Sequence, residues 1–246
     1  MDFPQSRSVA AQWRQVAHTG STNADLVALA HADPALPHLT VLMTRDQRSG
    51  RGRLDRVWQA PAGSALAVSV LVRVRQVPAA LRGWIPLVAG AAMTSAVRAQ
   101  LPGLDTGLKW PNDVLVGGRK ICGILAEGVA GFESVVIGSG VNTAMAAADL
   151  PVPTATSFAA LGIECDEDAL LAGYLGELDR LLGALATDPA TVRAAVRGEC
   201  LTLGREVNVS LPDGSVLRGV ATDVDEEGRL VVGGRAVSAG DVVHVR

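Results

Sequence analysis

The fold is decided by residues 108–141, LKWPNDVLVGGRKICGILAEGVAGFESVVIGSGV. This stretch contains three apolar, strand-like runs, which occupy residues 108–116, 120–129 and 134–141. The segments between them, residues 117–119 and 130–133, are short and contain glycine. Because short glycine-containing turns join antiparallel strands, the stretch predicts three consecutive strands connected by hairpin-type turns.

The sequence on either side adds further strands and helices. Ser21, Thr22 and Asn23 form a hydroxyl-rich N-cap for a short helix that continues to residue 30. The helical periodicity of residues 85–100 predicts a helix that packs across the sheet. Strands are expected at residues 39–43 and 65–74, and later helices at 166–185 and 189–196. The predicted fold class is α+β, with a mixed, mostly antiparallel sheet.

The last part of the chain has a different pattern. From residue 206 onward, short β-rich runs alternate with glycine-containing turns at 212–214, 227–228 and 233–234. This pattern is typical of a small barrel of about five short strands. We therefore expect two domains, residues 1–198 and 199–246.

Composition limits the possible functions. A net charge of −3 gives no global electrostatic case for nucleic-acid binding. Three widely spaced cysteines form no CxxC pair, and four histidines share no ligand spacing, so neither a disulfide framework nor a metal cluster is expected. The N-terminus has no apolar signal segment, and the longest uncharged stretch, residues 57–72, is too short to span a bilayer. We expect a cytoplasmic protein without a membrane partner.

A basic loop, residues 48–58, joins the two strands predicted at 39–43 and 65–74. It carries four arginines and two glycines, in the sequence RSGRGRLDRVW. Glycines allow the backbone to fold closely around a ligand, and guanidinium groups bind phosphate or carboxylate. The loop is interpreted as an anion-binding loop, with a merely solvated basic loop as the alternative, since it matches neither the P-loop nor the dinucleotide fingerprint.

Two other motifs combine polar groups with strand ends. Residues 109–113, KWPND, bring together a cation, an aromatic ring, an amide and a carboxylate between one strand and the next. They form either a self-bonded turn or a site for a phosphate and its Mg²⁺, with Lys120 returning beside them. Residues 138–142, GSGVN, allow close backbone approach, although a bulge or a tight strand exit would have the same sequence.

The motifs, in their order along the chain, resemble those of a biotin-protein ligase: residues 21–23, Gln47, the basic loop, residues 109–113, Lys120 with residues 123–125, and residues 138–142. The resemblance extends over residues 20–182, and the tail from residue 201 is similar to that family's C-terminal SH3-like domain. It implies the catalytic fold shared by biotin and lipoyl ligases and class II aminoacyl-tRNA synthetases. It also implies a two-step reaction, in which biotin and ATP form biotinyl-5′-AMP and a lysine of an acceptor protein then takes the biotinyl group.

The resemblance also implies roles for individual residues. Biotin binding is assigned to Ser21, Thr22, Asn23, Gln47, Arg51, Gly52, Arg53 and Lys120. Nucleotide binding is assigned to Gly50, Trp58, Lys109, Asn112 and Asn142, with Asn112 near the Mg²⁺ that accompanies ATP. Lys120, Arg51 and Arg53 are the expected catalytic residues. The role of Asp113 is left open.

The resemblance is incomplete at two places. Leu54 and Asp55 occupy a part of the basic loop where the family commonly has a glycine. Only 20 residues precede the first motif, too few for the winged helix-turn-helix of some members. We therefore expect the monofunctional type, biotin-[acetyl-CoA-carboxylase] ligase, without repressor activity or DNA binding.

The expected acceptor is a biotin carboxyl carrier domain of an acyl-CoA carboxylase, docked by edge-strand pairing. The expected oligomeric state is a monomer or weak homodimer. Three alternatives remain: a lipoate or octanoate ligase of the same fold, a non-enzymatic biotin- or nucleotide-binding module, and a nucleic-acid-binding protein. The first is expected to show a histidine-containing signature that this chain does not have, and the overall charge disfavours the third.

Overall fold

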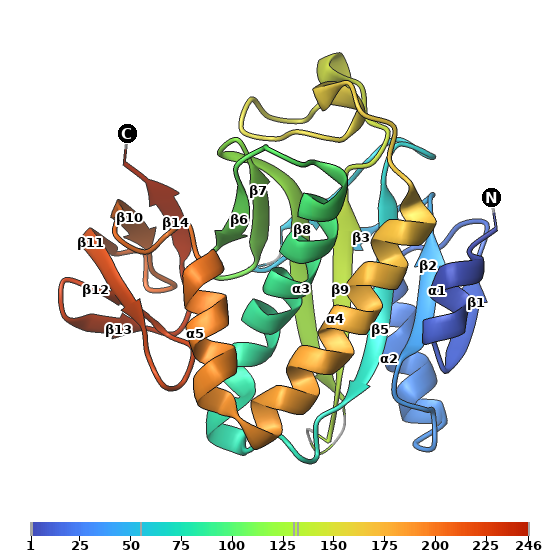
Figure 1. The fold of residues 1–246 in the computed structure, drawn as a ribbon, viewed down its shortest axis with the longest axis horizontal. Helices are drawn as coiled ribbons and strands as arrows, with labels where there is room; N and C mark the ends of the chain where they lie inside the picture. The colour runs from blue at the N-terminus through green and yellow to red at the C-terminus, as the bar shows by residue number, and fades with distance from the viewer. Residues whose placement is uncertain (1, 55, 130, 132, 246) are drawn as a thin grey trace.

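A seven-stranded sheet forms the centre of the molecule in the computed structural model, which describes residues 2–54, 56–129, 131 and 133–245 (Figure 1). Its strands, in spatial order, are β1 (Gln12–Gln15), β2 (Thr40–Thr44), β5 (Leu66–Arg73), β9 (Ser134–Val141), β8 (Arg119–Val129), β7 (Asp113–Val116) and β6 (Thr106–Lys109). The pairing of β1 with β2 is parallel, and the other five pairings are antiparallel. The predicted mixed, mostly antiparallel sheet is confirmed.

Residues 108–141 form the predicted strands with one exception. The runs at 120–129 and 134–141 form β8 and β9, which pair along their length. The run at 108–116 is not one continuous strand: it divides into the end of β6 and the whole of β7, which form a hairpin. The expectation that residues 109–113 join one strand to the next is confirmed. Pro111, which has no N–H to donate to a sheet, lies at the turn after a cis peptide bond. In the predicted turn at 130–133, Ala130 and Phe132 lie outside the described residues.

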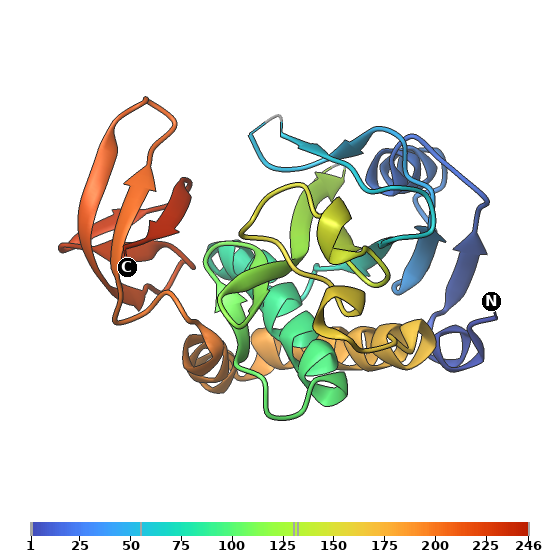
Figure 2. The ribbon, with the colours of Figure 1, turned by 90° about the horizontal axis from the view of Figure 1, so that it is seen from above.

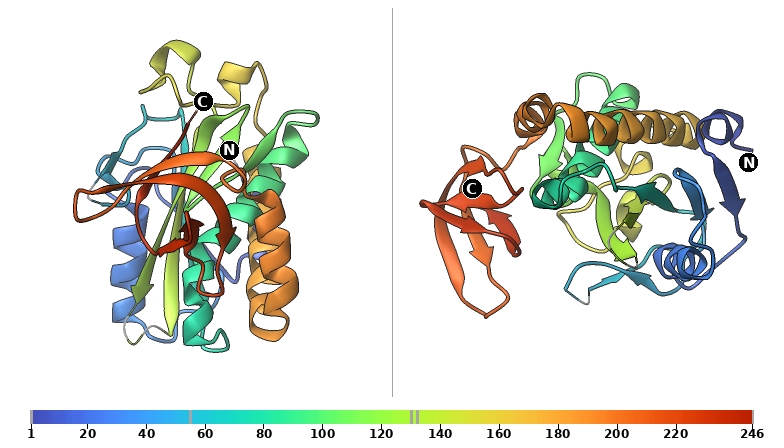
Figure 3. Two further views of the ribbon diagram at one scale, coloured as in Figure 1. Left: turned by 90° about the vertical axis from the view of Figure 1, so that its left-hand side faces the viewer. Right: turned by 90° about the horizontal axis from the view of Figure 1, so that it is seen from below.

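Helices cover both faces of the large sheet. Helix α2 (Thr22–Ala32) lies on one face, whereas α3 (Ile85–Gln100) and α4 (Glu167–Thr187) lie on the other (Figures 2 and 3). Helix α5 (Pro189–Glu199) follows α4. These four helices and the N-cap at Ser21 confirm the predicted elements. Helix α1 (Pro4–Val9) and strand β1 were not predicted, because each is too short to show a periodic pattern.

The segment Ala79–Gln100, which contains α3, has the length and composition of a membrane span. In this fold, however, 67% of its most apolar window is buried inside the protein. Met93 and Val97 of α3 are fully buried, in the same apolar core as Leu175 and Leu178 of α4. The apolar character of this segment is accounted for by its place in the core.

The C-terminal part folds as a separate five-stranded antiparallel sheet. Its strands are β10 (Glu206–Ser210), β11 (Val216–Val224), β12 (Leu230–Val232), β13 (Arg235–Val237) and β14 (Asp241–His244). They pair in the order β13-β12-β11-β10-β14, which fits an SH3-like domain and confirms the predicted strand number. β13 and β14 lie at the two ends of this order. Among the described residues, the hydrogen bonds therefore define an open sheet and no closed barrel. The division after residue 198 stays a prediction.

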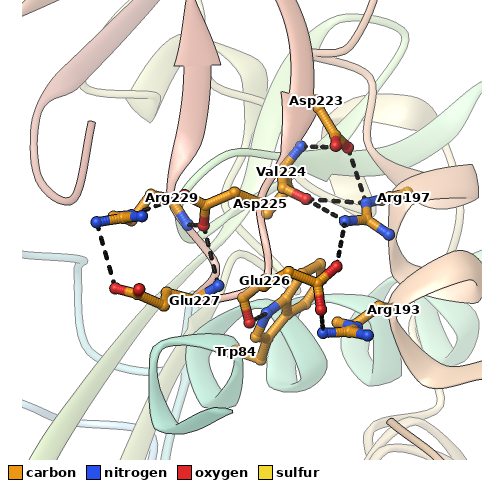
Figure 4. Close-up of polar contacts among 9 residues, drawn as sticks. All are labelled: Trp84, Arg193, Arg197, Asp223, Val224, Asp225, Glu226, Glu227 and Arg229. Atoms are coloured by element: carbon orange, nitrogen blue, oxygen red, sulfur yellow. Dashed lines mark hydrogen bonds and ion pairs between the residues drawn. The ribbon is translucent and has the colours of Figure 1, made fainter. Parts of the chain in front are cut away.

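Two buried tryptophans attach this domain to the rest of the molecule. The indole Nε1 of Trp84 donates to the carbonyl of Glu226 at 3.0 Å, and that of Trp110 donates to the carbonyl of Gly228 at 3.1 Å. Both acceptors lie in the turn between β11 and β12, at residues 225–229. Figure 4 shows Glu226 of this turn beside Trp84. A buried indole N–H needs a partner, so the turn both satisfies these rings and fixes the domain.

Arginines of α5 reinforce the same junction. The Arg197 guanidinium stacks over the Trp84 ring at 5.4 Å, donates to the carbonyl of Val224 and pairs with Asp223 at 2.8 Å. Arg193 pairs with Glu226 (Figure 4). The two folded units are therefore held by main-chain and side-chain contacts together.

A neutral histidine lies at this junction. Thr202 Oγ1 accepts from the amide of Trp110 at 3.0 Å and lies 3.1 Å from His244 Nε2. The histidine tautomer decides which of these two atoms donates the hydrogen bond. Burial, followed by the charges of Lys109 and Arg205, lowers the pKa of His244 to about 4.

Acidification should therefore destabilise the wild type more than the variant His244→Gln. The folded-state pKa is below the unfolded value of 6.5, so the unfolded chain takes up the proton first as pH falls from 6.5 towards 4. We expect the wild type to lose about 1 kcal/mol more unfolding free energy than the variant between pH 7 and pH 4.5, after allowance for partial exposure. Urea unfolding at both pH values measures this, and equal losses would contradict it.

Candidate functional site

The site has a floor of small residues on the face of the sheet that α2 covers. In the register of the sheet, Ala67, Gly140 and Gly123 lie in one row across β5, β9 and β8. In the next row on the same face, Ser69 and Gly138 lie side by side. Because side chains alternate between the two faces of a strand, these positions leave a shallow space above three neighbouring strands.

The glycines of this floor are in close contact with side chains that were predicted to belong to the site. A Cβ atom on Gly138 would lie 2.2 Å from Oδ1 of Asn23, and one on Gly140 would lie 2.5 Å from the Trp58 ring. A Cβ on Gly123 would lie 2.9 Å from Nζ of Lys120. The sequence left open whether GSGVN is a bulge or a place of close approach, and the structure shows close approach within a regular strand.

One end of the pocket consists mostly of uncharged hydrogen-bonding groups. Gln47 Oε1 accepts from the amide and the hydroxyl of Thr22, at 2.9 and 3.1 Å. Ser69 Oγ lies 2.8 Å from Thr22 Oγ1 and 2.6 Å from Asn23 Oδ1. Asn23 Nδ2 donates to Glu127 Oε2 at 2.7 Å. Thr22 and Asn23, in the first turn of α2, and Ser69, in β5, are buried, so the fold sets their positions. Gln47, in the loop after β2, and Glu127, in β8, are half-buried.

The other end is cationic, and here protein groups face each cation. Lys120 Nζ lies 2.6 Å from Asp113 Oδ1, and Arg53 Nη1 donates to Asn112 Oδ1 at 3.1 Å. Asn112 Nδ2 in turn donates to the carbonyl of Ile124 at 2.7 Å. The KWPND motif is thus both a turn and part of the pocket wall.

The basic loop closes the pocket with a short hairpin that was not predicted. Strands β3 (Gly50–Arg51) and β4 (Val57–Trp58) pair with each other, and Gly50 lies directly against Trp58. Arg51 pairs with Glu127 at 2.9 Å, and Arg56 pairs with Asp241. Leu54 has a positive φ of 53°, a left-handed conformation that a glycine would adopt more easily. Asp55, noted above as a departure from the family pattern, lies outside the described residues.

Burial changes the charge chemistry of this end. Desolvation lowers the pKa of the Arg53 guanidinium and of the Lys109 ammonium. The hydrogen bond from Arg56 lowers the pKa of Asp241. Poorly hydrated cations interact more strongly with an anion than exposed ones. The arrangement can therefore bring two anionic groups together and offset their repulsion.

The structure brings most of the predicted site residues to one cavity. Those that line it are Ser21, Thr22, Asn23, Gln47, Arg51, Gly52, Arg53, Trp58, Asn112 and Lys120, and Asp113 lies among them. Three others, Gly50, Lys109 and Asn142, lie outside the lining. Gly50 pairs with Trp58 in the hairpin and lies against it. The Asn142 side chain donates to the carbonyl of Thr156 at 2.9 Å. Their assignment to nucleotide binding stays a prediction.

Among the residues at the site that were not predicted, three are polar residues from outside the recognised motifs: Ser69, Glu127 and Asp241. Ser69 lies inside a buried strand, and Glu127 lies near the end of a long strand, so neither is part of a recognisable motif. Asp241 lies in the C-terminal domain, 185 residues from Arg56. A search for carboxylates able to balance the loop arginines would have produced candidates, but no local pattern could choose among them.

Comparisons with known proteins agree with this arrangement. The model of the biotin/lipoate A/B protein ligase family matches residues 17–143, and that of the biotin protein ligase C-terminal domain matches residues 202–245. The chain is 43% identical to the biotin–[acetyl-CoA-carboxylase] ligase of Mycobacterium tuberculosis over 244 residues, which cover 95% of this chain and 90% of that protein. It is 33% identical to the bifunctional ligase/repressor BirA of Escherichia coli, over 76% of this chain and 59% of that protein.

A solved structure shares the fold. The biotin protein ligase from Aquifex aeolicus in complex with biotin and ATP superposes with a TM-score of 0.79 and 22% identity, covering 96% of this chain and 99% of that one. The matches to the two family models and the extent of the Mycobacterium tuberculosis alignment are decisive. The chain belongs to the biotin protein ligases of the biotin/lipoate A/B protein ligase family.

Proposed function

We propose that the protein biotinylates a lysine of an acceptor protein in two steps that consume ATP. A biotin carboxylate oxygen attacks the α-phosphorus of ATP, and the bond to pyrophosphate breaks. The acceptor lysine amine then attacks the acyl carbon of biotinyl-5′-AMP, the bond to AMP breaks, and the amine loses a proton. The names of the Mycobacterium tuberculosis and Aquifex aeolicus relatives support this assignment.

The proposal rests mainly on a change in the pocket lining along the strands, from mostly uncharged hydrogen-bonding groups at one end to cationic groups at the other. Asn23 lies over Gly138, whereas Trp58 lies over Gly140 and Lys120 over Gly123, one pleat further along. Two residues of a strand span about 7 Å. A substrate with a neutral, hydrogen-bonding ring at one end and a carboxylate at the other fits this order, with the ring near Asn23 and the carboxylate near Lys120.

The charged residues then have distinct roles. Lys120 bridges the biotin carboxylate and the α-phosphate, which offsets the repulsion between two anions that must meet. Arg51, Gly52 and Arg53 close over the anhydride and exclude water from it. Trp58 is placed to stack on the adenine. In this proposal the enzyme needs no covalent intermediate, since the mixed anhydride is itself the activated species.

Magnesium enters the proposal together with the nucleotide. Among the described residues, no group of three or more His, Cys, Asp or Glu side chains gathers to hold a metal ion. Mg²⁺ bound to substrate phosphates needs only one or two protein oxygens, and Asn112, Asp113 and Asp241 line the pocket. These residues fit an Mg²⁺ ion that is bound to the nucleotide phosphates. Asn112 Oδ1 would bind the ion only after its hydrogen bond from Arg53 is broken. The ion would neutralise phosphate charge.

The acceptor is proposed to be the biotin carboxyl carrier domain of an acyl-CoA carboxylase, docked by strand pairing against β1, an outer strand of the large sheet. The outer edge of β6 already pairs with Cys200 through Leu108. The name of the Mycobacterium tuberculosis relative supports this choice of acceptor. The cytoplasmic location, the monomeric or weakly dimeric state and the lack of repressor activity stay predictions.

Lys120→Ala should abolish most of the adenylation. We expect biotin-dependent exchange of labelled pyrophosphate into ATP to fall by about 100-fold or more, because the central cation between two anions is lost. Arg51→Ala should reduce exchange as well. Arg119→Ala is the matched control, since Arg119 is an exposed neighbour on the same strand. Exchange with lipoate instead of biotin would identify a lipoate ligase, and exchange with neither acid would favour a binding module.

Two glycine substitutions should separate the two ends of the pocket. Gly138→Ala pushes Asn23 aside and should raise the KM for biotin by about tenfold or more, whereas Gly140→Ala displaces Trp58 and should raise the KM for ATP instead. Gly176→Ala on α4 is the control, because a Cβ there would meet no atom within 4 Å. An equal effect of both pocket variants on both KM values would contradict the proposed orientation.

A further inference from the structure

A fully buried serine lies beneath the hydrogen-bonding end of the pocket. Ser69 belongs to β5 and has no exposed surface. Its hydroxyl oxygen is 2.6 Å from Asn23 Oδ1 and 2.8 Å from Thr22 Oγ1. Because Thr22 lines the cavity, Ser69 is one hydrogen bond away from any ligand that Thr22 binds.

The hydrogen bonds of Asn23 set the direction in which Ser69 donates. Asn23 Nδ2 donates to the carbonyl of Leu125 at 3.1 Å and to Glu127 Oε2 at 2.7 Å. A carbonyl and a carboxylate accept hydrogen bonds, so the amide nitrogen faces them and Asn23 Oδ1 faces Ser69. The short contact between Ser69 Oγ and Asn23 Oδ1 therefore requires the Ser69 hydrogen.

Gln47 makes the same demand on the Thr22 hydroxyl. Gln47 Oε1 accepts from the amide of Thr22 at 2.9 Å and lies 3.1 Å from its hydroxyl oxygen. Because a backbone N–H can only donate, the oxygen of the Gln47 side chain, and not its nitrogen, faces Thr22. The contact between Thr22 Oγ1 and Gln47 Oε1 is then filled only by the Thr22 hydrogen.

The contacts of the two hydroxyls need more hydrogens than these hydroxyls possess. They join Ser69 to Asn23, Ser69 to Thr22 and Thr22 to Gln47. Ser69 and Thr22 carry one hydroxyl hydrogen each, so one contact brings two oxygens together without a hydrogen. Turning the Thr22 hydrogen toward a ligand would leave a second such contact, which is costly for buried groups. Thr22 therefore presents a lone pair, and not a hydrogen, to the cavity.

We propose that Ser69 is a positioning residue that determines substrate specificity, an inference that rests on the proposed function. By engaging the hydroxyl hydrogens of this network, Ser69 makes Thr22 an acceptor, which selects a substrate ring that carries an N–H at this point. The ureido ring of biotin carries N–H groups, whereas the dithiolane ring of lipoate carries none. A ring of the same shape with oxygen in place of the N–H would bring lone pairs together and bind more weakly.

Removal of the Ser69 hydroxyl should release this constraint. In Ser69→Ala, Gln47 Oε1 keeps the amide hydrogen of Thr22. The Thr22 hydroxyl can then turn toward a ligand oxygen and leave no more than one contact unfilled, as in the wild type. Ser134→Ala is the matched control, since Ser134 is also a buried serine of the large sheet but accepts from Arg73 at the start of β9.

The test measures the Kd of the full-length protein for biotin and for its two cyclic carbamate analogues, in which one or the other ureido N–H is replaced by oxygen. Calorimetric titration without ATP separates binding from catalysis. For the wild type, the more weakly bound carbamate should have a Kd about 20-fold or more above that of biotin. In Ser69→Ala this ratio should fall by about fivefold, whereas Ser134→Ala should keep the wild-type ratio. In a Thr22→Val background, Ser69→Ala should not change the ratio further, because Ser69 acts through Thr22.

An equal ratio in the wild type and in Ser69→Ala would overturn the proposal, even with weaker binding of all three compounds, because Ser69 would then serve packing alone. A wild type that binds both carbamates as tightly as biotin would overturn it too, as would a further change of the ratio in the Thr22→Val background. Failure of the proposed ligase function is seen separately, in the pyrophosphate exchange assay, and leaves these binding ratios readable. A wild type that binds none of the three compounds would overturn both.

Discussion

The site depends on the close approach of side chains to a sheet surface on which three glycines leave the backbone open. Gly138 and Gly140 on β9 and Gly123 on β8 leave room for Asn23, Trp58 and Lys120 to lie directly on the backbone. The approach is possible only where the three central strands keep a regular register, because one residue of slip would turn larger side chains toward the pocket. The helices on both faces hold that register by burying the rest of each strand.

Charge compensation is the second constraint on the pocket. Lys120, Arg51 and Arg56 face Asp113, Glu127 and Asp241, respectively. Several unpaired cations in one cavity would repel one another, and their desolvation would destabilise the fold. The carboxylates reduce that cost and keep the cations in place. A phosphate or carboxylate substrate then replaces or shares an existing partner, which makes binding an exchange of ion pairs.

The C-terminal domain also supports the pocket. Its turn at residues 225–229 completes the hydrogen bonding of two buried tryptophans, and one of these, Trp110, is followed in the chain by two residues of the pocket wall. Its strand β14 begins with the carboxylate that faces Arg56. The domain is therefore part of the frame around the site, and its attachment through Arg197 and Trp84 keeps that frame in one piece.

The sequence by itself determined the elements whose signals are local. Helix α3 and strand β9 match the predicted ranges because periodicity and flanking turn residues are properties of a short window. The N-cap at Ser21 and the order of the motifs, and with them the family, could also be read without coordinates. Residues 108–116 were grouped as one apolar run because Trp110 and Pro111 are apolar, although the junction between two strands at residues 109–113 was recognised.

Only the tertiary structure decided which charges meet. Glu127 and Asp241 lie 76 and 185 residues from the arginines they bind, and the sequence around them resembles any other solvent-facing strand. Such pairs depend on strand order, register and the docking of a second domain. These depend on contacts between distant parts of the chain, which no local pattern encodes, and the balance of charge in the pocket could therefore be seen only once the chain was folded.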